Sequence, residues 1–154
     1  MGLEKHWDEY EVGEVIHTSG RTLTDADIRM FIGATDATHP AHVDAEYCKS
    51  HPFKKIVVPG ALTLGVIDGF VTSDLVPRKL KIGHYGYDKI RFLAPVYPGD
   101  TLTMIATVME KKTLNDEFGV VKFEYQVKNQ DGKLAVIVHD LQMIERDISK
   151  KEEG

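Results

Sequence analysis

The stretch from position 36 to position 44 holds the side chains best suited to acid–base chemistry. Two aspartates, Asp36 and Asp44, and two histidines, His39 and His42, fall within nine positions of a loop rich in threonine, aspartate and proline. Histidine titrates near neutral pH and a carboxylate can hold a water molecule, so an Asp and a His on one loop indicate general acid–base catalysis. The structural alternatives are a turn-forming role for Asp36 and a helix cap at Asp44, and for Asp44 the cap is favoured.

Histidines near these acids could in principle bind a metal ion. The spacing of His39, His42 and His51 matches no zinc pattern, so we expect neither a metal nor a cofactor. Three other histidines are expected on the surface or hydrogen-bonded in the core: His17, His84 and His139.

Gly60 is the second candidate for chemistry. Pro59 and Gly60 precede a long apolar segment, and proline is tolerated at a helix start because the first amides there have no helical partner. A free amide at Gly60, aimed by the helix dipole, would stabilise an anionic oxygen as an oxyanion hole does. Tight packing of the helix would require glycine equally well, and the spacing alone leaves both interpretations open.

The segment that must position these residues is a helix within residues 57–73. Apolar residues from Ala61 to Val71 fall on every side of a helical wheel, so this helix is expected to be wrapped by other elements. At about 21 Å it is too short to span a bilayer, which needs roughly 20 apolar residues. Gly65 and Gly69 lie on one face, where another backbone could come close.

The rest of the chain predicts an antiparallel sheet around that helix. A strand within 12–23 is followed by a short helix capped by Thr24, and two-residue alternation of apolar side chains begins after residue 74. Predicted strands over 79–93, 102–108, 121–127 and 134–144 are joined by turns, among them Pro98-Gly99 and Asp131-Gly132. We therefore expect an α+β domain, with a curved sheet of about five strands and dimerisation through a sheet edge.

Length and composition narrow the function class. The 154 residues predict a single domain over 1–154, in which Trp7 and Tyr10 attach the N-terminal segment and 145–154 is a charged, frayed tail. A net charge of −5 argues against nucleic-acid binding. The single cysteine, Cys48, and the absence of an apolar run at the N-terminus favour a cytoplasmic protein without a membrane partner.

Three segments resemble one known family. HPAHVDAEYC, VVPGALTLG and YDKIRFLAPVYPGDTL are similar, in this order, to motifs of the MaoC-like (R)-specific enoyl-thioester hydratases, which have the hot-dog fold. The matches span about residues 30–110. This resemblance implies a curved sheet around the central helix.

The resemblance also implies a site. The catalytic histidine would be His42, the amide that binds the thioester carbonyl would be that of Gly60 between Pro59 and Ala61, and the catalytic aspartate would be Asp36. Five residues separate Asp36 from His42, one more than is usual in the family, and Thr35 and His39 replace its usual Gly and Asn. If the extra residue follows Asp36 the loop bulges and the pair is kept, whereas if it precedes Asp36, Ala37 takes the catalytic position.

The resemblance implies a hydro-lyase that hydrates 2-enoyl thioesters or dehydrates 3-hydroxyacyl thioesters of coenzyme A or acyl carrier protein. It also implies a homodimer or a larger assembly of dimers, with the acyl tunnel at the subunit interface. A thioesterase in which Asp36 activates water and a non-catalytic acyl-thioester-binding module are the alternatives on the same fold.

Overall fold

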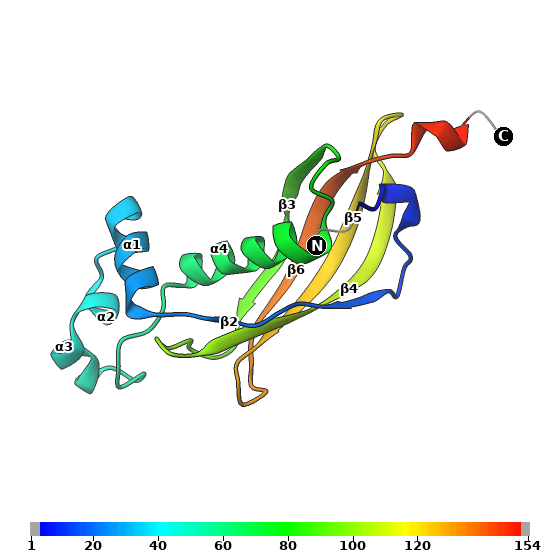
Figure 1. The fold of residues 1–154 in the computed structure, drawn as a ribbon. Helices are drawn as coiled ribbons and strands as arrows, with labels where there is room; N and C mark the ends of the chain where they lie inside the picture. The colour runs from blue at the N-terminus through cyan, green and yellow to red at the C-terminus, as the bar shows by residue number, and fades with distance from the viewer. Residues whose placement is uncertain (1–3, 152–154) are drawn as a thin grey trace.

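The computed structural model describes residues 4–151 (Figure 1). A curved antiparallel sheet holds one long helix, α4 (Gly60–Phe70), on its concave face. This arrangement is the hot-dog fold, so the predicted fold class is confirmed.

The sheet has the strand order β1-β4-β5-β6-β3, with every pair antiparallel and β2 paired with β4. Alternation along β5 places every second side chain from Val121 to Val127 in the core, as the sequence predicts. Gly99 and Gly132 have positive φ angles of 95° and 75°, as expected for their turns. The strands are β1 (Val15–His17), β2 (Arg21–Thr22), β3 (Ile82–Phe92), β4 (Thr101–Thr113), β5 (Phe118–Lys128) and β6 (Leu134–Glu145).

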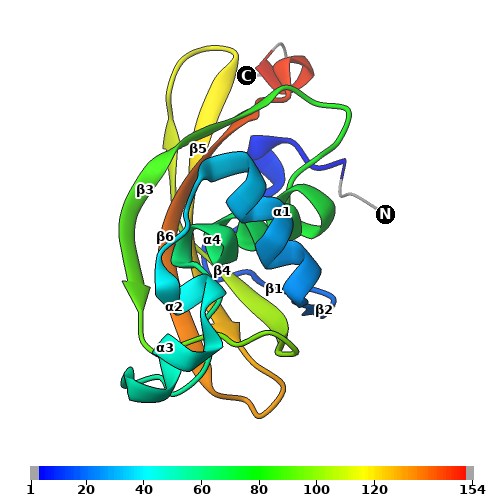
Figure 2. The same cartoon turned by 90° about the vertical axis from the view of Figure 1, so that its left-hand side faces the viewer.

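Three helices before α4, which we call the overhang, lie together beyond one end of the sheet (Figures 1 and 2). They are α1 (Asp25–Thr35), α2 (Pro40–Val43) and α3 (Ala45–Ser50). The predicted caps are confirmed, because Thr24 accepts from the Asp27 amide and Asp44 Oδ1 accepts from the Tyr47 amide at 3.0 Å. No helix within residues 4–151 is long and apolar enough to cross a membrane.

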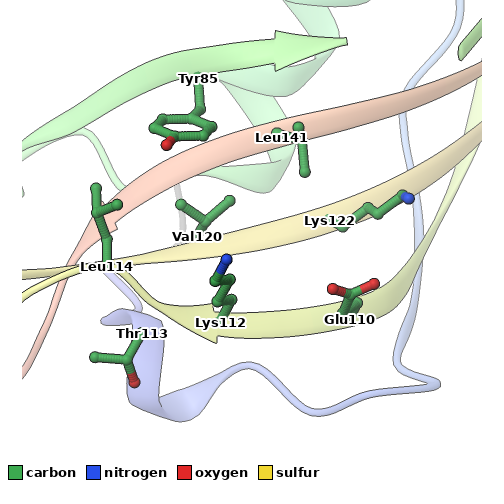
Figure 3. Close-up of a pocket in the computed structure, with 8 residues that line it drawn as sticks. All are labelled: Tyr85, Glu110, Lys112, Thr113, Leu114, Val120, Lys122 and Leu141. Carbon is green, nitrogen blue, oxygen red and sulfur yellow. The ribbon is translucent and has the colours of Figure 1, made fainter. Parts of the chain in front are cut away.

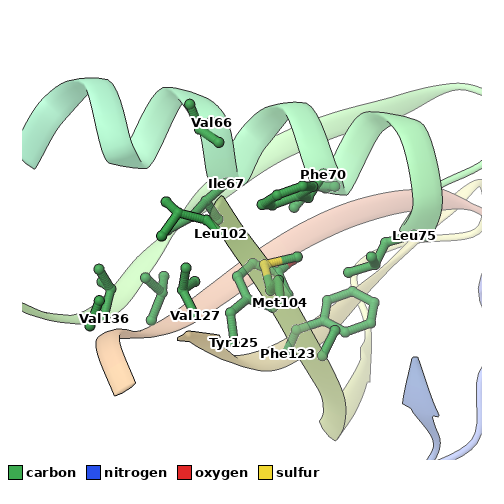
Figure 4. Close-up of a cluster of buried hydrophobic side chains, with 14 of the residues drawn as sticks. Val66, Ile67, Phe70, Leu75, Leu102, Met104, Phe123, Tyr125, Val127 and Val136 are labelled. Atoms are coloured by element: carbon green, nitrogen blue, oxygen red, sulfur yellow. The ribbon is translucent and has the colours of Figure 1, made fainter. Parts of the chain in front are cut away.

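The core lies between α4 and the concave face of the sheet (Figure 4). Val66, Ile67 and Phe70 of α4 are buried there, against side chains of β4, β5 and β6. The opposite face of α4 is exposed and carries Ala61, Asp68 and Gly65, and a Cβ at Gly65 would meet no residue of another element within 4 Å among residues 4–151. The expectation that the helix is wrapped all round is therefore wrong for a single chain, because the sheet covers only one side of it. A π-helical turn, η2 (Val71–Leu75), continues the helix.

The N-terminal segment is attached as expected, but the expected frayed tail is wrong for residues 145–151. Trp7, in the 3₁₀ turn η1 (Trp7–Glu9), donates to the Val120 carbonyl at 3.1 Å, and the buried Tyr10 donates to the Leu75 carbonyl at 2.7 Å. Glu145 ends β6, and the guanidinium of Arg146 lies 5.2 Å from the Trp7 ring. The short turn η3 (Ile148–Lys151) follows, while 152–154 lie outside the described residues.

The packing of Trp7 against Gly119 of β5 gives a stability prediction. A Cβ at Gly119 would overlap the Trp7 indole, so Gly119→Ala is expected to lower the free energy of unfolding by about 1–3 kcal/mol, the range for overpacking. Gly33→Ala is the matched control, since no atom lies within 4 Å of its Cβ position in α1, and it is expected to stabilise by about 0.5–1 kcal/mol. Urea unfolding measures both, and equal stability of Gly119→Ala and wild type would contradict the packing role of Trp7.

Candidate active site

A pocket of about 350 Å³ opens at the N-terminus of α4. The overhang, the start of α4 and the segment that follows β3 contribute its walls. His42 and Thr63 are its polar side chains, and the other residues that line it are glycine or mainly apolar: Phe53, Val57, Val58, Gly60, Phe92, Leu93, Ala94, Pro95 and Val96. The pocket therefore suits an apolar group that carries one reactive polar end.

His42 is fixed by the backbone of Val57. Its Nδ1 lies 2.8 Å from the Val57 carbonyl oxygen, and the Val57 amide donates to the Ala41 carbonyl at 3.1 Å. Because a carbonyl oxygen only accepts, Nδ1 carries the proton, and Nε2 of the neutral ring keeps its lone pair. His42 thus has the tautomer that a general base requires.

Gly60 offers a backbone donor to the same pocket. The amides of Leu62 and Thr63 both donate to the Pro59 carbonyl, at 3.0 and 3.1 Å, whereas no acceptor within residues 4–151 is bonded to the Gly60 amide. A Cβ at position 60 would lie 2.9 Å from the tip of the half-exposed Phe92 ring, so a larger residue here would require that ring to shift. An anionic oxygen near this amide would also be stabilised by the positive end of the α4 dipole.

The residues that flank Gly60 do not line the pocket. Pro59 is buried as the N-cap residue of α4, and Ala61 is exposed on the open face of the helix. Their predicted substrate contacts stay predictions.

Asp36 lies apart from the pocket in a single chain. It is the exposed C-cap of α1, with a left-handed φ of 57°, and it is absent from the pocket lining. The Thr38 amide donates to the Asp36 carbonyl at 2.8 Å, which closes a three-residue turn around Ala37. The loop therefore makes its tight turn directly after Asp36, at the place where an extra residue would keep Asp36 in the family position.

Three of the other histidines have structural partners. His39 caps α2 through Nδ1, which accepts from the Ala41 amide at 3.2 Å. The expectation that His84 and His139 are satisfied is confirmed, since they pair with Asp140 at 2.8 Å and with Glu124 at 3.1 Å. Among residues 4–151, no group of three or more His, Cys, Asp or Glu is arranged to hold a metal ion.

Sequence reasoning missed a buried polar network around Asp140. This carboxylate accepts from Tyr125 at 2.8 Å and from Gln142 at 2.6 Å, in addition to its bond with His84. Burial, followed by the nearby Asp140 charge, raises the pKa of Tyr125 well above its ordinary value. The signal in the sequence was the phase of β6, where Asp140 and Gln142 alternate with residues on the opposite face and so share the buried face with Val138.

A second pocket, of about 200 Å³, lies away from these residues (Figure 3). It is lined by residues of β3, β4, β5 and β6 and by Leu114 just beyond β4: Tyr85, Glu110, Lys112, Thr113, Leu114, Val120, Lys122 and Leu141. These side chains alternate with the buried ones on the same strands and so face away from α4. None of the predicted site residues lines it.

A curved sheet around one helix, with an apolar pocket at the N-terminus of that helix, defines a hot-dog protein. Comparison with known proteins identifies the group more closely. The chain belongs to the MaoC-like domain family, whose model matches residues 9–130.

Individual relatives agree with this assignment. The chain is 28% identical over 143 residues to the uncharacterised protein YdeM of Bacillus subtilis, covering 85% of this chain and 96% of that one. It is 35% identical over 88 residues to an (R)-specific enoyl-CoA hydratase of Rhodospirillum rubrum, covering 57% of this chain and 59% of that enzyme. The structure of a monoamine oxidase regulatory protein from Archaeoglobus fulgidus superposes with a TM-score of 0.85 at 30% identity, covering 96% of this chain and 97% of that one.

Proposed function

We propose that this protein is a hydro-lyase that adds water to 2-enoyl thioesters, or removes it from 3-hydroxyacyl thioesters, of coenzyme A or acyl carrier protein. One observation carries the proposal: the free amide of Gly60 and the oriented imidazole of His42 line the same mainly apolar pocket. The (R)-specific enoyl-CoA hydratase among the relatives supports the choice of reaction.

In the proposed mechanism His42 and Gly60 act on opposite ends of the enoyl thioester. Nε2 of His42 takes a proton from water as the water oxygen bonds to Cβ, and the electron pair of the double bond moves onto the thioester oxygen. The Gly60 amide stabilises that enolate, which then collapses as Nε2 of His42 returns the proton taken from water to Cα and the imidazole becomes neutral again. General acid–base transfer contributes about 10²–10⁴-fold to the rate and one oxyanion donor about 10²–10³-fold, so both groups are needed.

Asp36 is proposed to orient the attacking water together with His42. The turn at Ala37 supports this, because a tight turn at this place can accommodate an additional residue after Asp36. The exposure of Asp36 in a single chain instead favours the alternative of a non-catalytic acyl-thioester-binding module. The thioesterase alternative has Asp36 activate water against the carbonyl carbon.

For all three functions we propose a cytoplasmic location.

We also propose that the protein is a homodimer joined through β3. This edge strand pairs only with β6, and its side chains Tyr85 and Phe92 are 57% and 52% exposed. A partner on this edge would also cover the open face of α4 and the overhang. Multi-angle light scattering at micromolar concentration is expected to give twice the mass of one chain, and a monomer would contradict the proposal.

His42→Ala is expected to lower the hydration rate of crotonyl-CoA by at least about 10²-fold, because it removes the general base. The matched control is His39→Ala, which removes a cap of α2 and is expected to cost about 0.5–2 kcal/mol of stability with little change in rate. Loss of enoyl absorbance measures the rate, and circular dichroism checks the fold. A large loss of rate in His39→Ala alone would show that the base is assigned to the wrong histidine.

Asp36→Asn is expected to keep the fold and lose turnover by at least about 10²-fold, because the neutral amide still hydrogen-bonds but cannot hold the attacking water as a carboxylate does. The same absorbance assay measures the loss. Full activity of this variant would remove Asp36 from the mechanism and favour the non-catalytic module.

A further inference from the structure

Three lysines line a third pocket, beside the candidate active site. Lys49 of α3 and Lys54 and Lys55 of the following turn line a pocket of about 420 Å³ together with Ala45, Ile56, Tyr97 and Pro98. No carboxylate lines it, although the whole chain has 24 acidic residues against 19 Lys and Arg. The lining of this pocket is therefore positively charged although the whole chain has a net charge of −5.

The ammonium groups of this lysine cluster are only weakly engaged. Lys49 Nζ lies 2.6 Å from Glu46, but both side chains are largely exposed, at 68% and 78%, and such pairs contribute little. Lys55 Nζ lies 4.1 Å from the centre of the Tyr97 ring. No ion pair is found for Lys54 among the described residues. An incoming anion would thus displace few existing interactions.

The backbone that carries the cluster also forms a wall of the candidate active site. Residues 53–58 and 94–98 contribute to both pockets, and they are joined by Val58 N–H to the Val96 carbonyl at 2.8 Å and by the Tyr97 hydroxyl to the Phe53 carbonyl at 3.1 Å. A tight turn at Lys54, whose amide donates to the His51 carbonyl at 2.9 Å, holds the lysines in place. Lys54 and Gly60 are six positions apart in the sequence, so their backbones lie within about 20 Å of each other.

We propose that the lysine cluster binds the phosphate groups of the nucleotide end of coenzyme A, and this inference rests on the proposed thioester function. In a coenzyme A thioester the pantetheine arm separates the thioester from a diphosphate and a ribose phosphate. A site that holds the thioester at Gly60 therefore needs cations outside the acyl pocket, where the cluster lies. Lysine binds phosphate as a point charge, without the planar geometry of arginine.

The surroundings favour this ligand over an acidic carrier protein. The cluster lines one hollow of about 420 Å³, which is large enough for compact phosphate groups.

Isothermal titration calorimetry with coenzyme A tests the proposal without requiring turnover. The double variant Lys54→Gln/Lys55→Gln is expected to raise Kd about tenfold, equivalent to 1.4 kcal/mol. Added salt should weaken binding to the wild type more than to this variant. The matched control, Lys79→Gln/Lys112→Gln, removes two exposed lysines from the other end of the sheet. Lys79 precedes β3, and Lys112 lies at the same level of the sheet as the first residues of β3, whereas Phe92 ends that strand. The control is expected to leave Kd unchanged.

Kinetics with two thioesters separate this inference from the proposed activity. The double variant should raise KM for crotonyl-CoA and leave hydration of crotonyl-N-acetylcysteamine, which lacks the nucleotide, unchanged. Lysine-dependent binding of coenzyme A without turnover of either thioester would support the inference and overturn the hydro-lyase proposal. The inference is overturned if the wild type does not bind coenzyme A, if both double variants bind it equally, or if the lysines affect binding only of acyl carrier protein.

Discussion

The candidate site depends on the way in which one residue, Val57, joins the overhang to the central helix. The Val57 amide donates to the Ala41 carbonyl at 3.1 Å, and its carbonyl oxygen lies 2.8 Å from Nδ1 of His42. Both backbone groups of Val57 thus engage α2, and its side chain is buried. Val57 and Gly60 are three positions apart, so the chain between them spans at most about 10 Å. The two bonds to Val57 therefore hold the His42 imidazole near the N-terminus of α4.

The helix itself supplies the rigid half of the site. Burial of Val66, Ile67 and Phe70 against the sheet fixes the axis of α4, and the Phe92 ring lies close to position 60. The Gly60 amide therefore needs no rearrangement to meet a developing negative charge, which is the condition under which such a donor is effective. Polar groups on mobile loops would have to be ordered first, at a cost in entropy. The overhang, which lies beyond the sheet in Figure 1, completes the pocket by bringing His42 to this fixed amide.

Local signals in the sequence predicted much of the fold. The apolar alternation of β5, the glycine turns, the caps of α1 and α3 and the start of α4 at Pro59-Gly60 all follow from short-range rules, and each is present. The contact between Arg146 and Trp7 could not be read in this way, because it joins residues 139 positions apart in the chain. The exposed face of α4 was also missed, since an apolar wheel does not tell whether the sheet or a second copy of the chain covers each side.

The site was predictable only in part, for a related reason. His42 and Gly60 line one pocket because the chain between them turns back at residues 51–54. No sequence motif predicts this turn. The place of Asp36 depends on how one additional loop residue folds, and the left-handed conformation of Asp36 with the turn at Ala37 is a local solution that spacing alone leaves open. For Asp140 the local pattern was sufficient, because its phase within β6 places it on the buried face of the strand. It was missed because an aspartate is seldom buried in a core.

The most direct test of the account follows crotonyl-CoA with the purified protein by ultraviolet absorbance while a thiol reagent monitors free coenzyme A. The account predicts that enoyl absorbance falls and that no thiol appears, because water adds to Cβ and the thioester stays intact. Release of thiol would instead show hydrolysis at the carbonyl carbon. If neither signal changes while crotonyl-CoA still binds, the pocket is a binding site without catalysis and the central claim is wrong.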